Sequence, residues 1–469
     1  MDSGGELLLP RPAPSLGSRS DGRGGWRGAL FIVVLGFLER VGFFSVQGNL
    51  IIYLTGPLGM STAAAAAGAN AWAGTVQVLP LAGALAADSR LGRYRGVVAA
   101  GILYLLLMSL GADQFLPNDR ASRSSYFNWF HFSQSWGYAV STTAVSYVED
   151  NVGWTAGFGV CWATMVLYLA VFLLGARNYR RADPPADGRP FARAARTWAA
   201  RDFRRKDAGD TERLLTAERE EGEGLVATLL PIWTTSLVFG AVFSQVNTLF
   251  VKQSSTLERR VDALGGLVVV PPAALHCFVS ATYIAVLPLY DRALVPLARR
   301  LTGHHAGVTT LRRVGAGVAV SGASMAVAAL VEARRLRVAG DAGLADRPDA
   351  AVPMSVWWIA PQYVLMGIAG VLAEVGMEEF FYDQVPDELR SLGVALSVSA
   401  MGAGSYASAV LVSALDWATG SSGRSWFCDN LNRAHLDYFY WLLAGLVALQ
   451  VAVFLHFASR FVYRNKGEL

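Results

Sequence analysis

The stretch Phe31–Tyr53 constrains this chain most, because it places charge inside a segment long enough to cross a bilayer. Its sequence is FIVVLGFLERVGFFSVQGNLIIY, in which the apolar run is interrupted by Glu39, Arg40, Gln47 and Asn49. A charge at membrane depth costs at least about 2.5–3.5 kcal/mol, so it is retained mainly where it is paired, hydrated or functional. On a helix, Phe43 and Gln47 fall on or near the face of Glu39 and Arg40. Two interpretations follow: a structural ion pair between helices, or a site that handles protons and substrate.

The composition indicates an all-α polytopic membrane protein. Of 469 residues, 53% are hydrophobic and 16% are charged, whereas a soluble domain has about 25% charged residues. The three cysteines (Cys161, Cys277 and Cys428) have no disulfide or metal-ligand spacing. The formal charge of +4 comes from basic loops, which we interpret as determinants of membrane topology and not as a nucleic-acid surface. No catalytic constellation is recognisable, so we expect no enzyme, no cofactor and no bound metal.

The hydrophobic pattern predicts two helical bundles joined by a polar linker. The segments are a disordered cytosolic tail (1–27), an amino-terminal bundle (28–174), a cytosolic linker (175–224), a carboxy-terminal bundle (225–464) and a short tail (465–469). In the linker, Phe191, Ala195 and Trp198 repeat at helical spacing among many arginines, which predicts an amphipathic helix on the inner membrane surface. Predicted membrane helices are Gly28–Thr55, Ala63–Ala87, Tyr126–Tyr147, Trp154–Leu174, Leu225–Val251, Pro272–Leu289, Val308–Val331, Met354–Tyr382, Leu389–Trp417 and Leu436–Tyr463.

The region that should form the helix 3/4 hairpin is too short to cross the membrane twice. The apolar run Val97–Leu110 would be roughly 21 Å long as a helix, short of the hydrocarbon core of roughly 30 Å. If it crossed once, the basic linker would lie on the wrong side of the membrane for the positive-inside rule. Two crossings need about 40 residues, more than this region offers. We therefore predict about 11 membrane segments where 12 are expected, with an incomplete helix 3/4 hairpin near 97–115.

Several motifs along the chain indicate a family. The run GALAADSRLGRYR resembles the loop between helices 2 and 3 of the major facilitator superfamily. In the same order come GADQF, YFNWFHFS, YVEDNVGW, LLPIW, LPLYDRALVPLAR and EEFFYDQVPDELRSLG. With these motifs the chain resembles the plant nitrate/peptide transporters, a branch of the proton-dependent oligopeptide transporter family. The resemblance implies a major facilitator fold, with two helical bundles around a central cavity that opens alternately to each side.

The resemblance also implies a proton and substrate cavity, in which this chain departs from the family. The helix-1 motif Glu-x-x-Glu-Arg begins here with Gly36, so its first acid is missing. The family lysine of helix 4 falls in the part of the hairpin that is missing here, whereas its expected partner Glu379 remains. Phe243 stands where some nitrate-transporting relatives have histidine. The candidate cavity residues are Glu39, Arg40, Phe43, Phe44, Gln47, Phe243, Gln245, Asn247, Glu378 and Glu379.

Each candidate residue has an expected role. Glu39 and Glu379 are the proton acceptors, and Arg40 binds an anionic group of the substrate bidentately. Gln245 and Asn247 either hydrogen-bond within the cavity or join neighbouring helices. Without the helix-4 lysine, Glu379 should be neutral or paired elsewhere, because an unpaired buried charge is costly. A cytosolic latch is expected from Asp88, Arg93, Arg95, Asp383 and Arg390.

The sequence therefore leaves two functions open. The first is proton-coupled symport of a small solute (nitrate, a short peptide or a plant metabolite), with coupling impaired by the missing groups. The second is a non-transporting membrane sensor or partner, or a defective truncated product. Expected partners are a small-molecule or anion substrate, protons and the lipid bilayer, without nucleic acid, and the protein is expected to be a monomer. The plasma membrane and the vacuolar membrane both suit such a protein.

Overall fold

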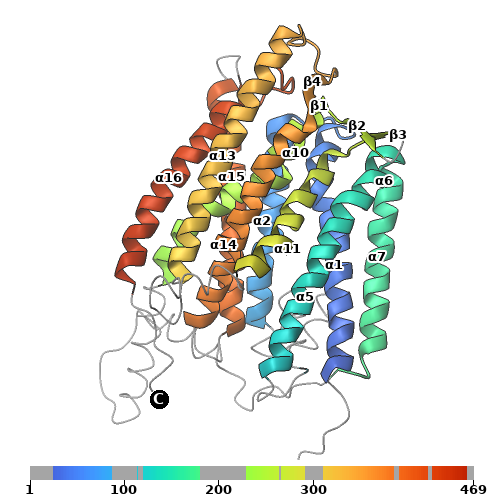
Figure 1. The fold of residues 1–469 in the computed structure, drawn as a ribbon, viewed down its shortest axis with the longest axis vertical. Helices are drawn as coiled ribbons and strands as arrows, with labels where there is room; N and C mark the ends of the chain where they lie inside the picture. The colour runs from blue at the N-terminus through green and yellow to red at the C-terminus, as the bar shows by residue number, and fades with distance from the viewer. Residues whose placement is uncertain are drawn as a thin grey trace, which may run out of the picture.

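The structure is a bundle of long helices that run side by side along one axis, with short strands at one end (Figure 1). It is a computed structural model, and it describes residues 25–86, 114, 120–179, 229–263, 266–290, 310–384, 390–420 and 425–461. Within these residues, eight helices are long and apolar enough to cross a membrane. They are Gly25–Thr55, Trp154–Gly175, Leu229–Ser255, Pro272–Leu289, Thr310–Asp341, Val356–Tyr382, Gly393–Gly420 and Leu436–Arg460. The prediction of an all-α polytopic fold is confirmed.

The helices of the amino-terminal half are coloured blue to green in Figure 1. Those that the structure describes are α1 (Gly25–Thr55), α2 (Thr62–Ala86), α5 (Arg120–Val140), α6 (Ser146–Asn151) and α7 (Trp154–Gly175). A π-helical turn, η2 (Ser141–Val145), joins α5 to α6 without a break. The predicted short hairpin, the linker helix and the terminal tails lie outside the described residues, apart from Gln114, residues 175–179 and residues 25–27. The predicted number of membrane segments therefore stays a prediction. The prediction of a disordered tail is wrong for Gly25, Trp26 and Arg27, which form the first turn of α1.

The carboxy-terminal half contributes most of the core. Its helices are the segment Leu229–Ser255, which contains η4 (Ser244–Asn247) and α10 (Leu249–Ser255), then η5 (Pro272–His276), α11 (Cys277–Leu289), α13 (Thr310–Asp341), η7 (Val356–Ile359), α14 (Ala360–Gln384), α15 (Arg390–Gly420) and α16 (Leu436–Arg460). Among the described residues of this half, four short strands that were not predicted pair at one end. They are β1 (Leu257–Glu258) with β4 (Val352–Ser355), and β2 (Arg260–Ala263) with β3 (Gly266–Val269).

Apolar side chains cover the outside of the bundle as well as its inside. On α7, Trp162 and Leu174 are each 71% exposed, and on α15 Trp417 is 82% exposed. A soluble protein rarely exposes so many large apolar side chains together, whereas a bilayer accommodates them. Helices α7, α15 and α16 therefore present lipid-facing surfaces.

Glycines let helices from the two halves approach closely. A Cβ atom built on Gly402 of α15 would lie 3.0 Å from the Gly74 carbonyl oxygen of α2 and 2.9 Å from the Gln77 Cβ of the same helix. Small residues at such contacts allow backbones to meet without an intervening side chain. The halves consequently share a tight interface along α2 and α15.

Helix α13 continues to Asp341, well past the predicted end at Val331. A charged run, EARRLR, follows Val331 in the sequence. The structure buries two of those charges as an ion pair, in which Arg335 Nη2 lies 2.7 Å from Glu332 Oε1 and both side chains are fully buried. Gln253 donates to Glu332, and Arg335 also donates to Asn432 and to the Leu431 carbonyl oxygen. Because each charge has a partner, the helix can carry them inside the protein.

This pair predicts a large effect for Arg335→Met. Removing one partner of a buried ion pair costs about 3–5 kcal/mol, because the other charge stays buried without compensation. We expect a markedly lower thermal unfolding midpoint for the purified protein in detergent. The control is Arg337→Met, the same change at an exposed position of α13. Equal midpoints for the two variants would contradict this account of α13.

Candidate functional site

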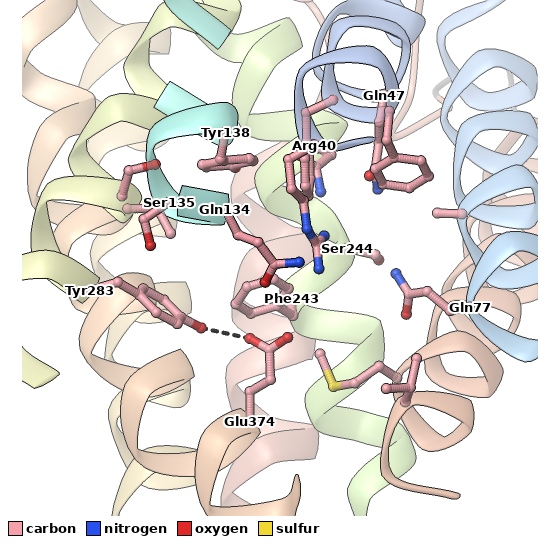
Figure 2. A pocket seen from close by; sticks show the side chains of 18 of the residues that line it. Arg40, Gln47, Gln77, Gln134, Ser135, Tyr138, Phe243, Ser244, Tyr283 and Glu374 are labelled. Carbon is pink, nitrogen blue, oxygen red and sulfur yellow. Dashed lines mark hydrogen bonds between the residues drawn. The ribbon is translucent and has the colours of Figure 1, made fainter. Parts of the chain in front are cut away.

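A cavity of about 670 Å³ lies between the two halves of the bundle. The amino-terminal half contributes wall residues from α1, α2 and α5, and the carboxy-terminal half contributes residues from Leu229–Ser255, α11, α14 and α15. Side chains from both halves point toward the same centre (Figure 2). The cavity is therefore placed where a relative movement of the two halves would change its access.

The charged pair of α1 forms part of this wall. Arg40 Nε lies 3.5 Å from Glu39 Oε2, and the two side chains are only 22% and 13% exposed. The Arg40 guanidinium also lies over the Phe44 ring, 5.4 Å from its centre. A cation over an aromatic face is attracted to the ring, so Phe44 helps to orient Arg40. The structure thus places the central charges of α1 at the cavity, where they can meet a solute.

Aromatic rings support this side of the wall. The Phe43 ring stacks on Trp72 of α2 at 5.4 Å, and the Phe44 ring meets the Tyr138 ring of α5 edge-on at 4.2 Å. Offset or edge-to-face pairs of this kind stabilise their arrangement beyond simple burial. They fix α1, α2 and α5 around Arg40.

Two further acids face the cavity from α14. Glu374 and Glu378 are one helical turn apart, and both line the wall. The Tyr283 hydroxyl of α11 donates a hydrogen bond of 2.6 Å to Glu374 Oε2, drawn as a dashed line in Figure 2. Our sequence analysis missed Glu374 and Tyr283. A second acid four residues before Glu378 in an apolar helix was the available signal.

The structure brings most of the predicted cavity residues together. Those that line the cavity are Glu39, Arg40, Phe43, Phe44, Gln47, Phe243, Asn247 and Glu378. Gln245 lies outside the wall, where its amide nitrogen donates 2.8 Å hydrogen bonds to Ser408 of α15 and to the Ala241 carbonyl oxygen. This geometry matches the alternative in which Gln245 joins two helices.

Glu379 also lies outside the cavity wall. Its Oε2 accepts a hydrogen bond of 2.9 Å from Arg313 Nη1 of α13, and its side chain is 50% exposed. Arg313 additionally donates to the Val371 carbonyl oxygen. The expected lysine from helix 4 could not have been its partner, since no lysine precedes Lys206 in the sequence. An arginine of the same half takes that place.

The predicted cytosolic latch falls mostly beyond what the structure describes. Asp88, Arg93 and Arg95 lie outside the described residues. Asp383 belongs to the last turn of α14 and Arg390 begins α15, but their side chains are outside the described part. The latch therefore stays a prediction.

Polar contacts join the two halves at the end of the bundle where α1 ends. Arg259 Nη1 of the carboxy-terminal half lies 2.9 Å from Asp150 Oδ2 of α6. Lys252 Nζ donates to Thr55 Oγ1 at 2.9 Å, and the Thr62 backbone N–H donates to Asp429 at 2.8 Å. Ile51, Ala63 and Ala66 pack in one apolar cluster with the carboxy-terminal half. We call this set of contacts the closed end.

Comparison with known proteins gives the family. A sequence profile of the POT family matches residues 106–222 and 215–427. This chain belongs to the POT family. The POT chain is 39% identical to protein NRT1/PTR family 5.10 of Arabidopsis thaliana, over 99% of this chain and 98% of that relative. It is 40% identical to protein NRT1/PTR family 5.16 of the same plant, over 95% and 94%. The predicted family resemblance is confirmed, and the family is one of transporters and not of enzymes.

Solved POT structures share the fold. The crystal structure of an auto-inhibited POT family peptide transporter matches with a TM-score of 0.77 at 19% identity, covering 94% of this chain and 99% of that one. A POT family transporter in complex with 5-aminolevulinic acid matches with a TM-score of 0.67 at 13% identity, covering 94% and 98%. The major facilitator fold and a multi-pass membrane protein follow from these findings.

The relatives carry residues that this POT chain lacks. The alignment with protein NRT1/PTR family 5.10 extends over 554 residues, whereas the chain has 469. Because nearly all of both chains is covered, the difference reflects gaps within the chain and not only at its ends. The short hairpin near 97–115 stays a prediction.

The closed end predicts a measurable change in access for Asp150→Lys. The variant places like charges together, so the closed end should open more often. In a background without Cys161, Cys277 and Cys428, Ser280→Cys in the cavity wall reports access by labelling with a membrane-impermeant maleimide. We expect labelling to rise about two- to fivefold, in keeping with the modest energy of a partly exposed ion pair.

Charge reversal provides the control. Asp150→Lys combined with Arg259→Glu restores opposite charges and should return labelling to the level of the reporter alone. If labelling is the same in the reporter alone, in Asp150→Lys and in the double variant, the ion pair does not hold this end closed.

Proposed function

We propose that this chain is a proton-coupled secondary transporter that moves a small solute through the central cavity by alternating access. The observation that carries the proposal is the cavity itself, where Glu39 and Arg40 of one half face Glu374 and Glu378 of the other. Contacts between the halves close one end of the bundle. Ionisable groups inside a membrane bundle mark ion and substrate pathways in many transporters.

Proton binding gives these groups two electrostatic states. A proton on Glu39 cancels the negative charge beside Arg40, and Arg40 then turns to the substrate or to the acids of α14. The two states differ in interaction energy across the halves, so proton and solute binding can shift the populations that open to each side. By the positive-inside rule, the closed end faces away from the cytosol.

At Gly36, where the first acid of the helix-1 motif is missing, a neighbouring ring fills the space beside the backbone. A Cβ atom built on Gly36 would lie 2.7 Å from the Phe130 ring of α5. Phe130 is fully buried and occupies the space that a longer side chain would need. Introducing Gly36→Glu would therefore displace the ring and is not expected to restore a second acid. In this proposal Glu39, the acid that α1 retains beside Arg40, carries the proton.

The solute class is left broad by this proposal: nitrate, a short peptide or a plant metabolite. The 5-aminolevulinic acid bound by one structural neighbour is small enough for a cavity of about 670 Å³. The plasma membrane and the vacuolar membrane both suit the proposed activity. A monomer suffices, because one chain supplies both halves of the cavity.

The second candidate function is a non-transporting membrane sensor or partner, or a defective product. One observation favours it: the relatives align over more residues than this chain contains. If the gap removes a membrane helix, the amino-terminal bundle loses one wall and proton coupling weakens. The test below separates this candidate from the transporter.

The variant Glu39→Gln tests proton coupling. In proteoliposomes we would measure uptake of radiolabelled nitrate, dialanine and 5-aminolevulinic acid with and without an inward proton gradient, and exchange of each tracer at equal concentration on both sides. We expect the gradient to stimulate wild-type uptake and to have no effect on Glu39→Gln, because an amide cannot release a proton. Exchange should persist in the variant.

The control is Glu258→Gln, the same change at an exposed position of β1. If the proton gradient stimulates uptake by Glu39→Gln as much as uptake by the control, Glu39 does not couple proton movement to transport. Wild-type protein that neither accumulates nor exchanges any tracer, although correctly inserted, would support the non-transporting candidate.

A further inference from the structure

The charged residues of the cavity wall do not balance. Three acids, Glu39, Glu374 and Glu378, and one base, Arg40, line the cavity in the part of the chain that the structure describes. Arg40 is adjacent to Glu39, which compensates its charge. Acids therefore outnumber bases in this wall, with two of them on α14.

The two acids of α14 differ in how they are held. Glu374 accepts the hydrogen bond from Tyr283, which fixes its carboxyl group. Glu378 has no hydrogen bond or ion pair with any residue that the structure describes. Carboxylates one turn apart on a helix repel each other, and a low-dielectric surrounding increases this repulsion. A positive charge between them would remove the repulsion.

Unused hydrogen-bond acceptors in the same wall point to the same kind of ligand. The amide oxygens of Gln47, Asn70 and Asn247 are buried and have no hydrogen-bond partner among the described residues. These three side chains are 5%, 1% and 8% exposed and line the cavity. Buried polar atoms without a partner are rare and costly, so such atoms indicate an absent ligand or water. A ligand rich in N–H donors satisfies acceptors, whereas nitrate offers none.

Aromatic surface lies beside the acids. Phe243 and Tyr138 line the same cavity as Glu374 (Figure 2). Aromatic faces attract organic cations and accept the apolar body of a ligand at the same time. The wall thus combines acids, acceptors and rings around one space.

We propose that the transported solute is an organic cation: a small molecule with a protonated amine on an apolar or aromatic body. The ammonium group lies between Glu374 and Glu378 and donates to their carboxylates, and the body packs on Phe243 and Tyr138. Arg40, paired with Glu39, stays available for the proton cycle. This inference rests on the proposed function, because it requires the cavity to be the transport site.

The test compares three probes that share one phenethyl body. Phenethylamine is cationic, 2-phenylethanol is neutral and 3-phenylpropionate is anionic. The full chain is reconstituted in proteoliposomes, and exchange of each radiolabelled probe is measured at equal concentration on both sides, together with the half-saturating concentration. We expect exchange of phenethylamine and little exchange of the other two probes.

Variants of the two acids sharpen the test. Charge-assisted hydrogen bonds to a carboxylate typically contribute enough that Glu374→Gln or Glu378→Gln should raise the half-saturating concentration for phenethylamine about tenfold or more. Glu258→Gln is the matched control and should leave it unchanged. Both cavity variants are isosteric with wild type, and correct insertion is checked by size-exclusion chromatography before reconstitution.

Four results would overturn the proposal. The anionic probe could be exchanged in preference to phenethylamine, or neither cavity variant could change phenethylamine exchange, which would leave the acids as proton carriers only. If nitrate or dialanine is exchanged and phenethylamine is not, the solute is not an organic cation, but the proposed transport function still holds. Exchange of no probe or tracer at all would defeat the proposed function together with this inference.

Discussion

The arrangement of the helices around the cavity depends on accommodating one charged guanidinium inside a membrane bundle. Arg40 stays charged under all ordinary conditions, so it needs an acid, aromatic faces and a polar space within reach. Glu39 supplies the acid, Phe44 the face and the cavity the space. Glu39 and Phe44 belong to α1 itself, whereas the cavity needs walls from other helices, so polar residues of both halves line one space. Glu39 and Arg40, for which the sequence allowed a structural or a functional role, line the same cavity as the acids of α14.

The halves are held together differently along the bundle. Close backbone contacts at Gly74 and Gly402 bring α2 and α15 together, and such contacts change little without sliding the helices. The closed end combines the partly exposed Asp150–Arg259 ion pair and a few hydrogen bonds with the packing of small or aliphatic side chains, and such an ion pair contributes little. A bundle with one weaker end can open there while its tighter contacts persist. Alternating access needs a bistable arrangement of this kind.

Much of the fold could be predicted from sequence, because long apolar segments report membrane helices directly. The ends of α1, α2 and α11 lie within a few residues of their predicted positions. The continuation of α13 could not be predicted, since its buried charges are compensated by each other and by Gln253, which is distant in sequence.

The site residues were predicted less well, because the packing of a helix against its neighbours determines which of its side chains face the cavity. Glu378 lines the wall and Glu379 pairs with Arg313, although the two are adjacent. Glu374 was missed because its partner Tyr283 lies in another helix. The fit of Phe130 against Gly36 likewise depends on a contact between two helices that neither segment reveals alone.

The central claim is that the Glu39–Arg40 pair links proton binding to the opening of the closed end. The most direct measurement is the distance between spin labels at Tyr147 of α6 and Val268 of β3, exposed positions on the two sides of the Asp150–Arg259 pair. The account predicts two distance populations whose ratio changes as the pH is lowered in wild type, and a ratio independent of pH in Glu39→Gln. A single population at every pH in wild type, or an unaltered pH response in the variant, would contradict it.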